Sequence, residues 1–193
     1  MPQPASNLLE SGPLRVQFEK LRDRWSHKLS VQNGDLWLPV ATSIEGSEQE
    51  PWPASPPIQE LHFETHAGKP VALGVGMSGS SHWSLCVTVD LETNSIQFEV
   101  ACRTKSRPDR LQSAYETQVP VESSSSQCVL QAPNSIRPII IRTTDADSQI
   151  LTASSGSTQT TLTVQPVSSQ TLPSPTQRWN YLFTLAKEPL SRV

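Results

Sequence analysis

The sequence predicts an all-β protein: an antiparallel β-sandwich, or a partly closed barrel, of about 10–12 strands with at most one short helix. Many short stretches alternate apolar and polar residues with the period of two that half-buried strands require. The connections between these stretches are too short for parallel crossovers, which predicts antiparallel pairing. A chain of 193 residues is long enough to bury a core of this kind.

The clearest alternation lies at the centre of the chain, in two stretches joined by a turn-rich segment. Their apolar positions are Trp83, Leu85, Val87 and Val89, followed by Ile96, Phe98, Val100 and Cys102. We expect an antiparallel hairpin in which Leu91 pairs with Ile96. This register places Cys86 and Cys102 on opposite faces of the sheet, so the two cysteines are not expected to form a disulfide.

The N-terminal part of the chain predicts five further strands. Residues 1–12 are expected to form a disordered tail, and residues 13–187 a single β-sandwich domain. The expected strands lie at 14–19, 24–31, 36–44 with a bulge at Pro39, around 61–63, and at 69–77. In the last of these, Gly74 and Gly76 alternate with apolar residues. Glycine inside a strand marks a bulge or a close approach of another backbone.

The C-terminal half is less regular. Residues 107–115 have a proline near the start and good helix formers after it, which predicts the one short helix. Strands are expected at 128–131 and 137–143, an exposed hairpin or loop at 150–153 with 160–167, and a strongly apolar, central last strand at 179–185. The segments near 104–127 and 145–176 are expected to be polar loop insertions in the sandwich.

Composition excludes several classes of function. The net charge is −3 and only 17% of residues are charged, so neither nucleic acid nor a membrane surface is an expected partner. No apolar run approaches the ~18 residues of a membrane-spanning helix. The N-terminus lacks the regions of a secretory signal, and three cysteines without metal-site spacing predict free thiols. We therefore expect a cytoplasmic location and no cofactor.

Two catalytic motifs match in letters but not in context. Residues 74–79 read GxGxxG, but the dinucleotide fingerprint needs a helix directly after it, and a strand is expected here. Residues 76–80 come close to the nucleophile elbow, which also needs a following helix. A hydrolase triad of Ser78, His82 and Asp90 is therefore not favoured.

The best-supported candidate site is an anion site at one end of the central hairpin. The expected register puts His82 beside Lys105 and Ser84 beside Arg103. A glycine and serine loop opens at the same end and offers backbone N–H groups, while arginine offers a fork for carboxylate or phosphate. The predicted ligand-binding residues are Ser78, Gly79, Ser80, His82, Arg103 and Lys105.

A row of possible metal ligands precedes this hairpin. His62, Glu64 and His66 alternate with apolar residues, which places them on one face of a strand. The two histidines are about 13 Å apart on an extended strand, so one ion cannot bind both. His62 and Glu64 can chelate a metal only with ligands from elsewhere. A solvated polar face is the favoured interpretation, and no metal site is predicted.

Trp52 stands out among the aromatic residues because it lies in a loop between two prolines. It is either an exposed anchor for a sugar or a protein, or a cap on the open end of the sandwich.

The leading interpretation is a non-catalytic binding or interaction module whose partner is a small anionic ligand or another protein. One alternative is an enzyme of sugar or acyl chemistry with an anion-binding loop at 78–81, using His82, Arg103 and Glu99. A second alternative is a metal-bearing β-barrel that uses His62 and Glu64. The fold class alone does not decide between them, because β-sandwiches host many functions.

Overall fold

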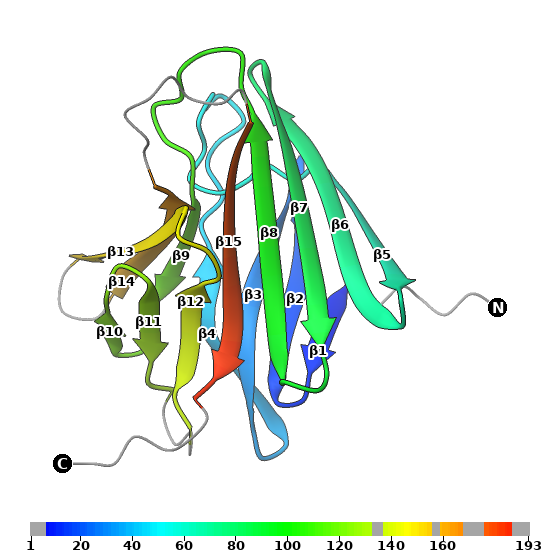
Figure 1. Ribbon diagram of the computed structural model, residues 1–193, viewed down its shortest axis with the longest axis vertical. Coiled ribbons are helices and arrows are strands. Elements are labelled where there is room, and N and C mark those ends of the chain that lie inside the picture. Colours follow the sequence, from blue (N-terminus) through cyan, green and yellow to red (C-terminus); the bar gives the residue numbers. More distant parts are fainter. Residues whose placement is uncertain (1–6, 133–136, 156–158, 168–175, 187–193) are drawn as a thin grey trace.

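All regular structure in the described part of the chain is β-strand. A computed structural model describes residues 7–132, 137–155, 159–167 and 176–186 (Figure 1). These residues form fifteen strands in two antiparallel sheets of seven and eight strands, and they contain no helix. The two sheets pack as a sandwich and do not close into a barrel. The all-β sandwich predicted from alternation is confirmed, and the barrel alternative is wrong.

The strands follow one another within each sheet in a defined order. The first sheet runs β1 (Leu8–Ser11), β2 (Leu14–Leu21), β3 (Arg24–Asn33), β4 (Leu36–Ser43), β9 (Ser113–Thr117), β14 (Gln159–Pro166) and β13 (Ser148–Ser155). The second runs β10 (Val121–Ser123), β11 (Gln127–Leu130), β12 (Ile139–Thr143), β15 (Thr176–Leu185), β8 (Ser95–Arg103), β7 (Ser81–Asp90), β6 (Lys69–Ser78) and β5 (Glu60–His66). The last strand, β15, lies between β12 and β8, so its predicted central place is confirmed.

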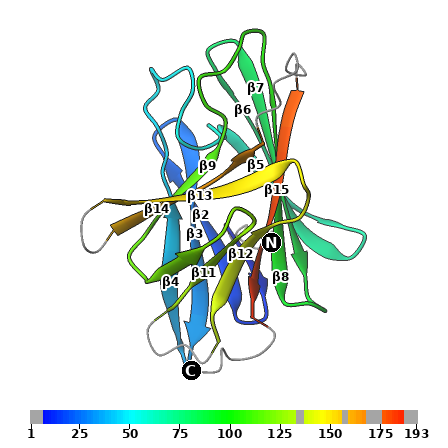
Figure 2. The ribbon, with the colours of Figure 1, turned by 60° about the vertical axis from the view of Figure 1, so that its left-hand side comes forward.

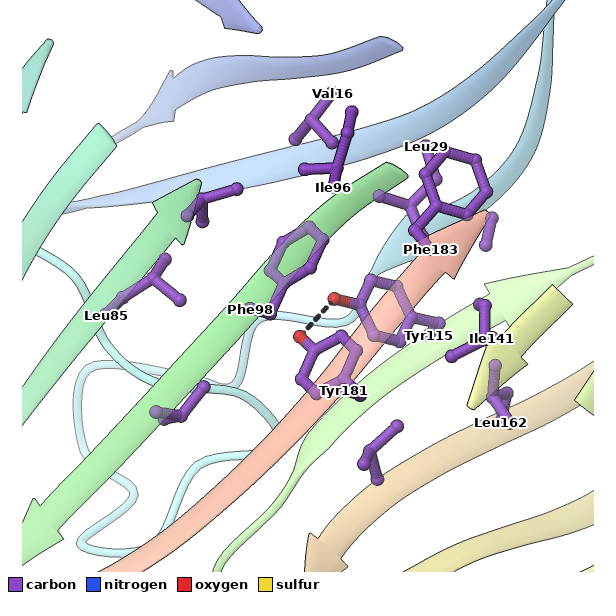
Figure 3. Close-up of a cluster of buried hydrophobic side chains, with 14 of the residues drawn as sticks. Val16, Leu29, Leu85, Ile96, Phe98, Tyr115, Ile141, Leu162, Tyr181 and Phe183 are labelled. Carbon is purple, nitrogen blue, oxygen red and sulfur yellow. Dashed lines mark hydrogen bonds between the residues drawn. The ribbon is translucent and has the colours of Figure 1, made fainter. Parts of the chain in front are cut away.

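The core fills the space between the two sheets. The largest fully buried side chains are Trp83, Trp179, Tyr115, Tyr181, Phe98 and Phe183. The rings of Phe98 and Tyr181 stack with centroids 4.8 Å apart, and Trp83 meets Trp179 edge to face at 6.0 Å. Figure 3 shows Phe98, Tyr115, Tyr181 and Phe183 converging from strands of both sheets. Paired aromatic rings add to the free energy that their buried area contributes.

The central hairpin β7–β8 is confirmed, but its register differs from the predicted one by two residues. Ile96 pairs with Val89 and not with Leu91, its predicted partner. A four-residue connection results, and its last residue, Asn94, has a φ of +48°. A shift of two residues leaves every side chain on its predicted face, so alternation alone does not fix this register.

The predicted separation of Cys86 and Cys102 is confirmed. Cys102 is buried on the inner face of β8, whereas Cys86 is half-buried on the outer face of β7. Both thiols are free, as is that of Cys128. Burial raises the pKa of the Cys102 thiol to about 12, which keeps it protonated and unreactive.

The close approach predicted at the glycines of β6 is also confirmed. Gly74 and Gly76 face the interior, where residues 57–58 cross directly over them. A Cβ on Gly74 would lie 2.6 Å from Ile58 Cγ2, and one on Gly76 would collide with the carbonyl oxygen of Pro57. The bulge expected near Pro39 is present, because the β3–β4 register shifts between Leu29 and Ser30.

Three expectations about non-strand segments need correction. Leu8–Ser11 forms β1, paired with β2, within the expected tail 1–12, of which residues 1–6 lie outside the described part. The segment 104–127 holds β9 and β10, and 145–176 holds the paired strands β13 and β14 (Figure 2), although 156–158 and 168–175 lie outside the described part. These strands are short or rich in Ser and Thr, and long-range pairing stabilises them.

The helix expected at 107–115 is wrong. Its last residues begin strand β9, which pairs with β4 and β14 and buries Ser113, Ala114 and Tyr115. Helix propensity at 107–115 is outweighed by the two neighbouring strands and by the burial of the tyrosine ring.

The described residues also hold no helix that is long and apolar enough to span a membrane.

We expect Gly76→Ala to lower the free energy of unfolding by about 1–3 kcal/mol, because the backbone at Pro57 must move to admit the new methyl group. Urea unfolding of the variant and the parent protein measures the difference. Leu151→Ala is the control at an exposed strand position, because Leu151 is 49% exposed on β13, and its expected change is within about 0.5 kcal/mol. Equal effects at the two positions would contradict the close approach.

Candidate functional site

The glycine and serine segment of the predicted anion site is a tight turn. Ser78 pairs with Ser81, so only Gly79 and Ser80 connect β6 to β7. Gly79 has a φ of +56°, as the first central position of a type II′ turn requires. The hydroxyl of Ser78 donates a hydrogen bond to the carbonyl oxygen of Glu50 at 2.6 Å. The open loop expected here is therefore corrected to a two-residue turn whose serine is already engaged.

The basic residues of the predicted site are brought together in part. His82 and Arg103 are direct cross-strand neighbours, and Met77 lies on the other side of His82. Lys105 lies beyond the end of β8, and Ser84 pairs with Ala101, so both expected pairings are wrong. His82, Arg103 and Lys105 are exposed on an open surface. Ligand binding at this place stays a prediction.

The acid–base group of the enzyme alternative does not converge. Glu99 pairs with Cys86, while His82 pairs with Arg103. Glu99 and Arg103 are four residues apart on one strand, which is about 13 Å. His82 and Glu99 therefore do not face a common reacting atom, as general acid–base catalysis requires.

The other two sequence candidates lie apart from this place. His62, Glu64 and His66 are all exposed on the edge strand β5, on one face as expected. No group of three His, Cys, Asp or Glu side chains suited to a metal occurs among the described residues. Trp52 is half-buried against the core, and its carbonyl accepts a hydrogen bond from Arg110 Nε at 2.7 Å. Its ring thus fits the capping alternative better than an exposed anchor.

A hollow of about 530 Å³ lies on the outer face of the eight-stranded sheet, where β7, β8, β15 and β12 lie side by side. Three basic side chains line it, Lys69, Arg137 and Arg142, together with one carboxylate, Asp90. Its polar lining includes hydroxyl and amide groups of Thr88, Asn94, Ser95, Gln97, Gln127 and Thr184. Cavities of this volume are typical of small-molecule sites.

The charged groups of the hollow are held in different ways. Arg137 Nε donates a hydrogen bond to the carbonyl oxygen of Ala186 at 2.7 Å, which fixes that guanidinium. Lys69 Nζ lies 3.8 Å from Asp90 Oδ2. The backbone N–H of Glu92, with Lys69 in a smaller role, lowers the pKa of Asp90, so this carboxyl is ionised. Arg142 is exposed and forms no ion pair with the residues that the structure describes.

The strongest perturbation of titratable groups lies in the core, between the sheets. His27 Nε2 lies 2.8 Å from Tyr115 Oη. Tyr115 Oη in turn lies 2.6 Å from Tyr181 Oη (Figure 3). Burial lowers the pKa of His27 to about 4, so its imidazole is neutral at pH 7. Burial also raises the pKa of Tyr181 to about 12, and it raises the pKa of Tyr115 well above the ordinary value for tyrosine. We call His27, Tyr115 and Tyr181 the core triad.

Glu45 extends this polar cluster. The backbone N–H of His27 donates to Ser43 Oγ at 2.8 Å, and Ser43 Oγ donates to Glu45 Oε1 at 2.6 Å. Glu45 Oε2 is buried and has no hydrogen-bond partner among the described residues. Burial raises the pKa of Glu45 to about 7. The cavity beside it, lined by His27 and Tyr181, measures about 10 Å³, which is room for one water molecule and not for a substrate.

Sequence reasoning missed both the hollow and the core triad, for different reasons. The hollow is lined by residues of several strands that are far apart in the sequence, so no local sequence pattern indicates it. His27, in contrast, lies on the same face of a predicted strand as Trp25, Leu29 and Val31, so it occupies an inward position. A polar residue at an inward position is a signal of a buried hydrogen bond, and it was available in the sequence.

Comparison with known proteins shows the fold alone. No protein-family model matches the chain, and no curated protein matches it. A mutant of heparan sulfate lyase HepC from Pedobacter heparinus is similar over 97% of this chain and 38% of its own, with a TM-score of 0.52 and 7% identity. The unmutated lyase gives a TM-score of 0.49 and 6% identity over 98% of this chain and 38% of its own. The chain therefore spans less than half of that lyase.

We expect Glu45→Gln to gain stability relative to the parent protein as pH rises from about 4.5 to about 7. The folded pKa of Glu45, about 7, exceeds the unfolded value of 4.5, so the folded state holds the proton and its stability falls over this window. Glutamine removes that loss. Urea unfolding at several pH values measures it.

The same substitution at Glu50 is the control with the opposite sign. Hydrogen bonds from Ser47 lower the pKa of Glu50, so the stability from its carboxylate is present at neutral pH and lost on acidification. Glu50→Gln should therefore lose stability relative to the parent as pH rises through about 4. A pH-independent difference for Glu45→Gln would show that Glu45 is not perturbed in the folded state.

Proposed function

We propose that this chain is a non-catalytic binding module that holds a small anionic, hydroxyl-rich ligand of the sugar-acid or sugar-phosphate class in the outer hollow. The observation that carries the proposal is the hollow itself, in which three cations meet a single carboxylate. Such a local positive balance in a chain of net charge −3 favours an anion at that place.

The polar lining supports a ligand with several hydroxyl groups. Side-chain amides such as Gln97 and Gln127 both donate and accept hydrogen bonds, as sugar hydroxyls do. Arg142 supplies the planar fork that binds carboxylate or phosphate with two parallel hydrogen bonds. Ile140 and Leu182 add apolar surface for the faces of a ring.

The lining also favours binding over catalysis. It contains neither histidine nor cysteine, and its one carboxylate, Asp90, is ionised next to Lys69. General acid–base chemistry needs a second group of matched pKa, and the lining offers none. The perturbed groups of the core triad lie between the sheets, away from this outer face.

The lining of the hollow suggests the first probes. Uronic acids and hexose phosphates carry both an anionic group for Arg142 and hydroxyl groups for the polar side chains.

We also infer a reducing, cytoplasmic location, which the three free cysteines support.

A thermal-shift screen tests the proposal. We expect a uronic acid or a hexose phosphate near 100 times its Kd to raise the Tm by about 5–10 °C, and a neutral hexose to raise it less. Arg142→Ala should weaken the affinity about 10- to 100-fold, because a charge-assisted hydrogen-bond pair is lost.

Arg103→Ala is the matched control, because Arg103 is an exposed arginine of the same sheet outside the hollow. It should leave the affinity unchanged. Loss of binding in Arg103→Ala alone would move the ligand to the site predicted from the sequence. No shift with any probe would refute an anion-binding role.

A further inference from the structure

The outer face of β6 presents a row of exposed apolar side chains. Leu73, Val75 and Met77 occupy alternate positions and are 37%, 50% and 47% exposed. They face outward because the intervening glycines take the inward positions against residues 57–58. We call these three residues the β6 strip. Single exposed apolar residues are common, but a contiguous row on one strand marks a contact surface.

The β6 strip continues across the neighbouring strands in regular rows. The ladders align Met77 with His82 and Arg103, Val75 with Ser84 and Ala101, and Leu73 with Cys86 and Glu99. The middle row carries only small side chains on β7 and β8. It therefore allows another surface to approach closely along its length.

We propose that the β6 strip is the interface between two copies of this chain. The two-fold axis lies in the plane of the interface and follows the middle row of Val75, Ser84 and Ala101 across the strands. Rotation about this axis places β6 of one copy over β6 of the other and reverses the order of the rows along the strands. Val75 then meets Val75 of the second copy, and Met77 meets Leu73. An isologous contact of this kind requires a self-complementary surface, and the apolar row satisfies that requirement.

The charges are complementary under the same rotation. Arg103 and Glu99 lie on β8 one row to either side of the axis, so Arg103 of each copy faces Glu99 of the other. Both side chains are exposed, and neither forms an ion pair with the described residues of its own chain. Gln97 Nε2 donates to Glu99 Oε1 at 3.0 Å, which leaves the second oxygen for the guanidinium.

The middle row ends in Glu60 on β5 and Arg178 on β15, and both side chains are exposed. Under the rotation, each of these two residues faces the same residue of the second copy. These ends lie where two twisted sheets diverge, and long side chains there reach water. The favourable contacts therefore concentrate on β6, β7 and β8.

The available area suits a modest dimer. The middle row lies three residues from the end of β6, so the two copies overlap over about seven residues of each strand. Four strands at about 4.8 Å spacing and seven residues at about 3.3 Å rise give a face of roughly 20 by 20 Å. About 400 Å² per copy is the size of a weak, transient interface. The equilibrium should therefore depend on protein concentration.

Sedimentation or light scattering of the full chain tests the interface. We expect a mass near twice 21.2 kDa that falls on dilution. Val75→Glu should abolish the dimer because it buries like charges on the axis. The control is Leu151→Glu, since Leu151 is an equally exposed strand leucine, 49% exposed, on the other sheet. This control should stay dimeric, and its circular dichroism and that of Val75→Glu should match the parent protein.

A charge exchange identifies the arrangement. Arg103→Glu and Glu99→Arg should each shift the equilibrium to monomer by about 10-fold or more, and the double exchange should restore dimerisation. A parent protein that is monomeric at every concentration overturns the proposal. So does a dimer that tolerates Val75→Glu, or a double exchange that fails to recover.

Discussion

The hydrogen bond between Tyr115 and Tyr181 joins the two sheets at the centre of the core. Tyr115 comes from β9 of the seven-stranded sheet and Tyr181 from β15 of the eight-stranded sheet, with their oxygens 2.6 Å apart. His27, on β3, lies within hydrogen-bond distance of Tyr115. The rings of His27 and Tyr181 stack on Phe98. Buried polar groups are costly unless all of them are paired, so this network holds the sheets in one relative position.

The outer face of the eight-stranded sheet follows from that arrangement. Once one set of alternate side chains is fixed inward, the other set must face outward. On β8 and β15 that outward set contributes Gln97 and Leu182 to the lining of the hollow. On β6 glycine takes the inward positions 74 and 76, and the apolar residues that alternate with these glycines lie outside and form the β6 strip. One core thus produces two different surfaces, a polar hollow and an apolar row, on a single sheet.

The sequence predicts the features that follow from the alternation of apolar and polar residues, and it does not predict the register or the long-range pairing of the strands. Faces, hairpins and the sandwich class follow from alternation, and the close approach at Gly76 follows from glycine in a strand. A two-residue register shift preserves the alternation, so alternation does not identify the cross-strand partner of Arg103. The predicted anion site therefore depends in part on wrong pairings, Ser84 with Arg103 and His82 with Lys105. The core triad brings together β3, β9 and β15, and strand β9 was hidden behind a local helix propensity that long-range pairing outweighs.

A double-mutant cycle between Tyr115→Phe and Tyr181→Phe tests the central claim most directly. Urea unfolding of the parent, both single variants and the double variant gives the coupling free energy. Each single change leaves the other hydroxyl short of a partner inside the core. We therefore expect the double variant to be more stable than the sum of the single losses predicts, with a coupling of about 1 kcal/mol or more. Additive losses would show that the two hydroxyl groups do not stabilise each other and that this hydrogen bond does not hold the sheets together.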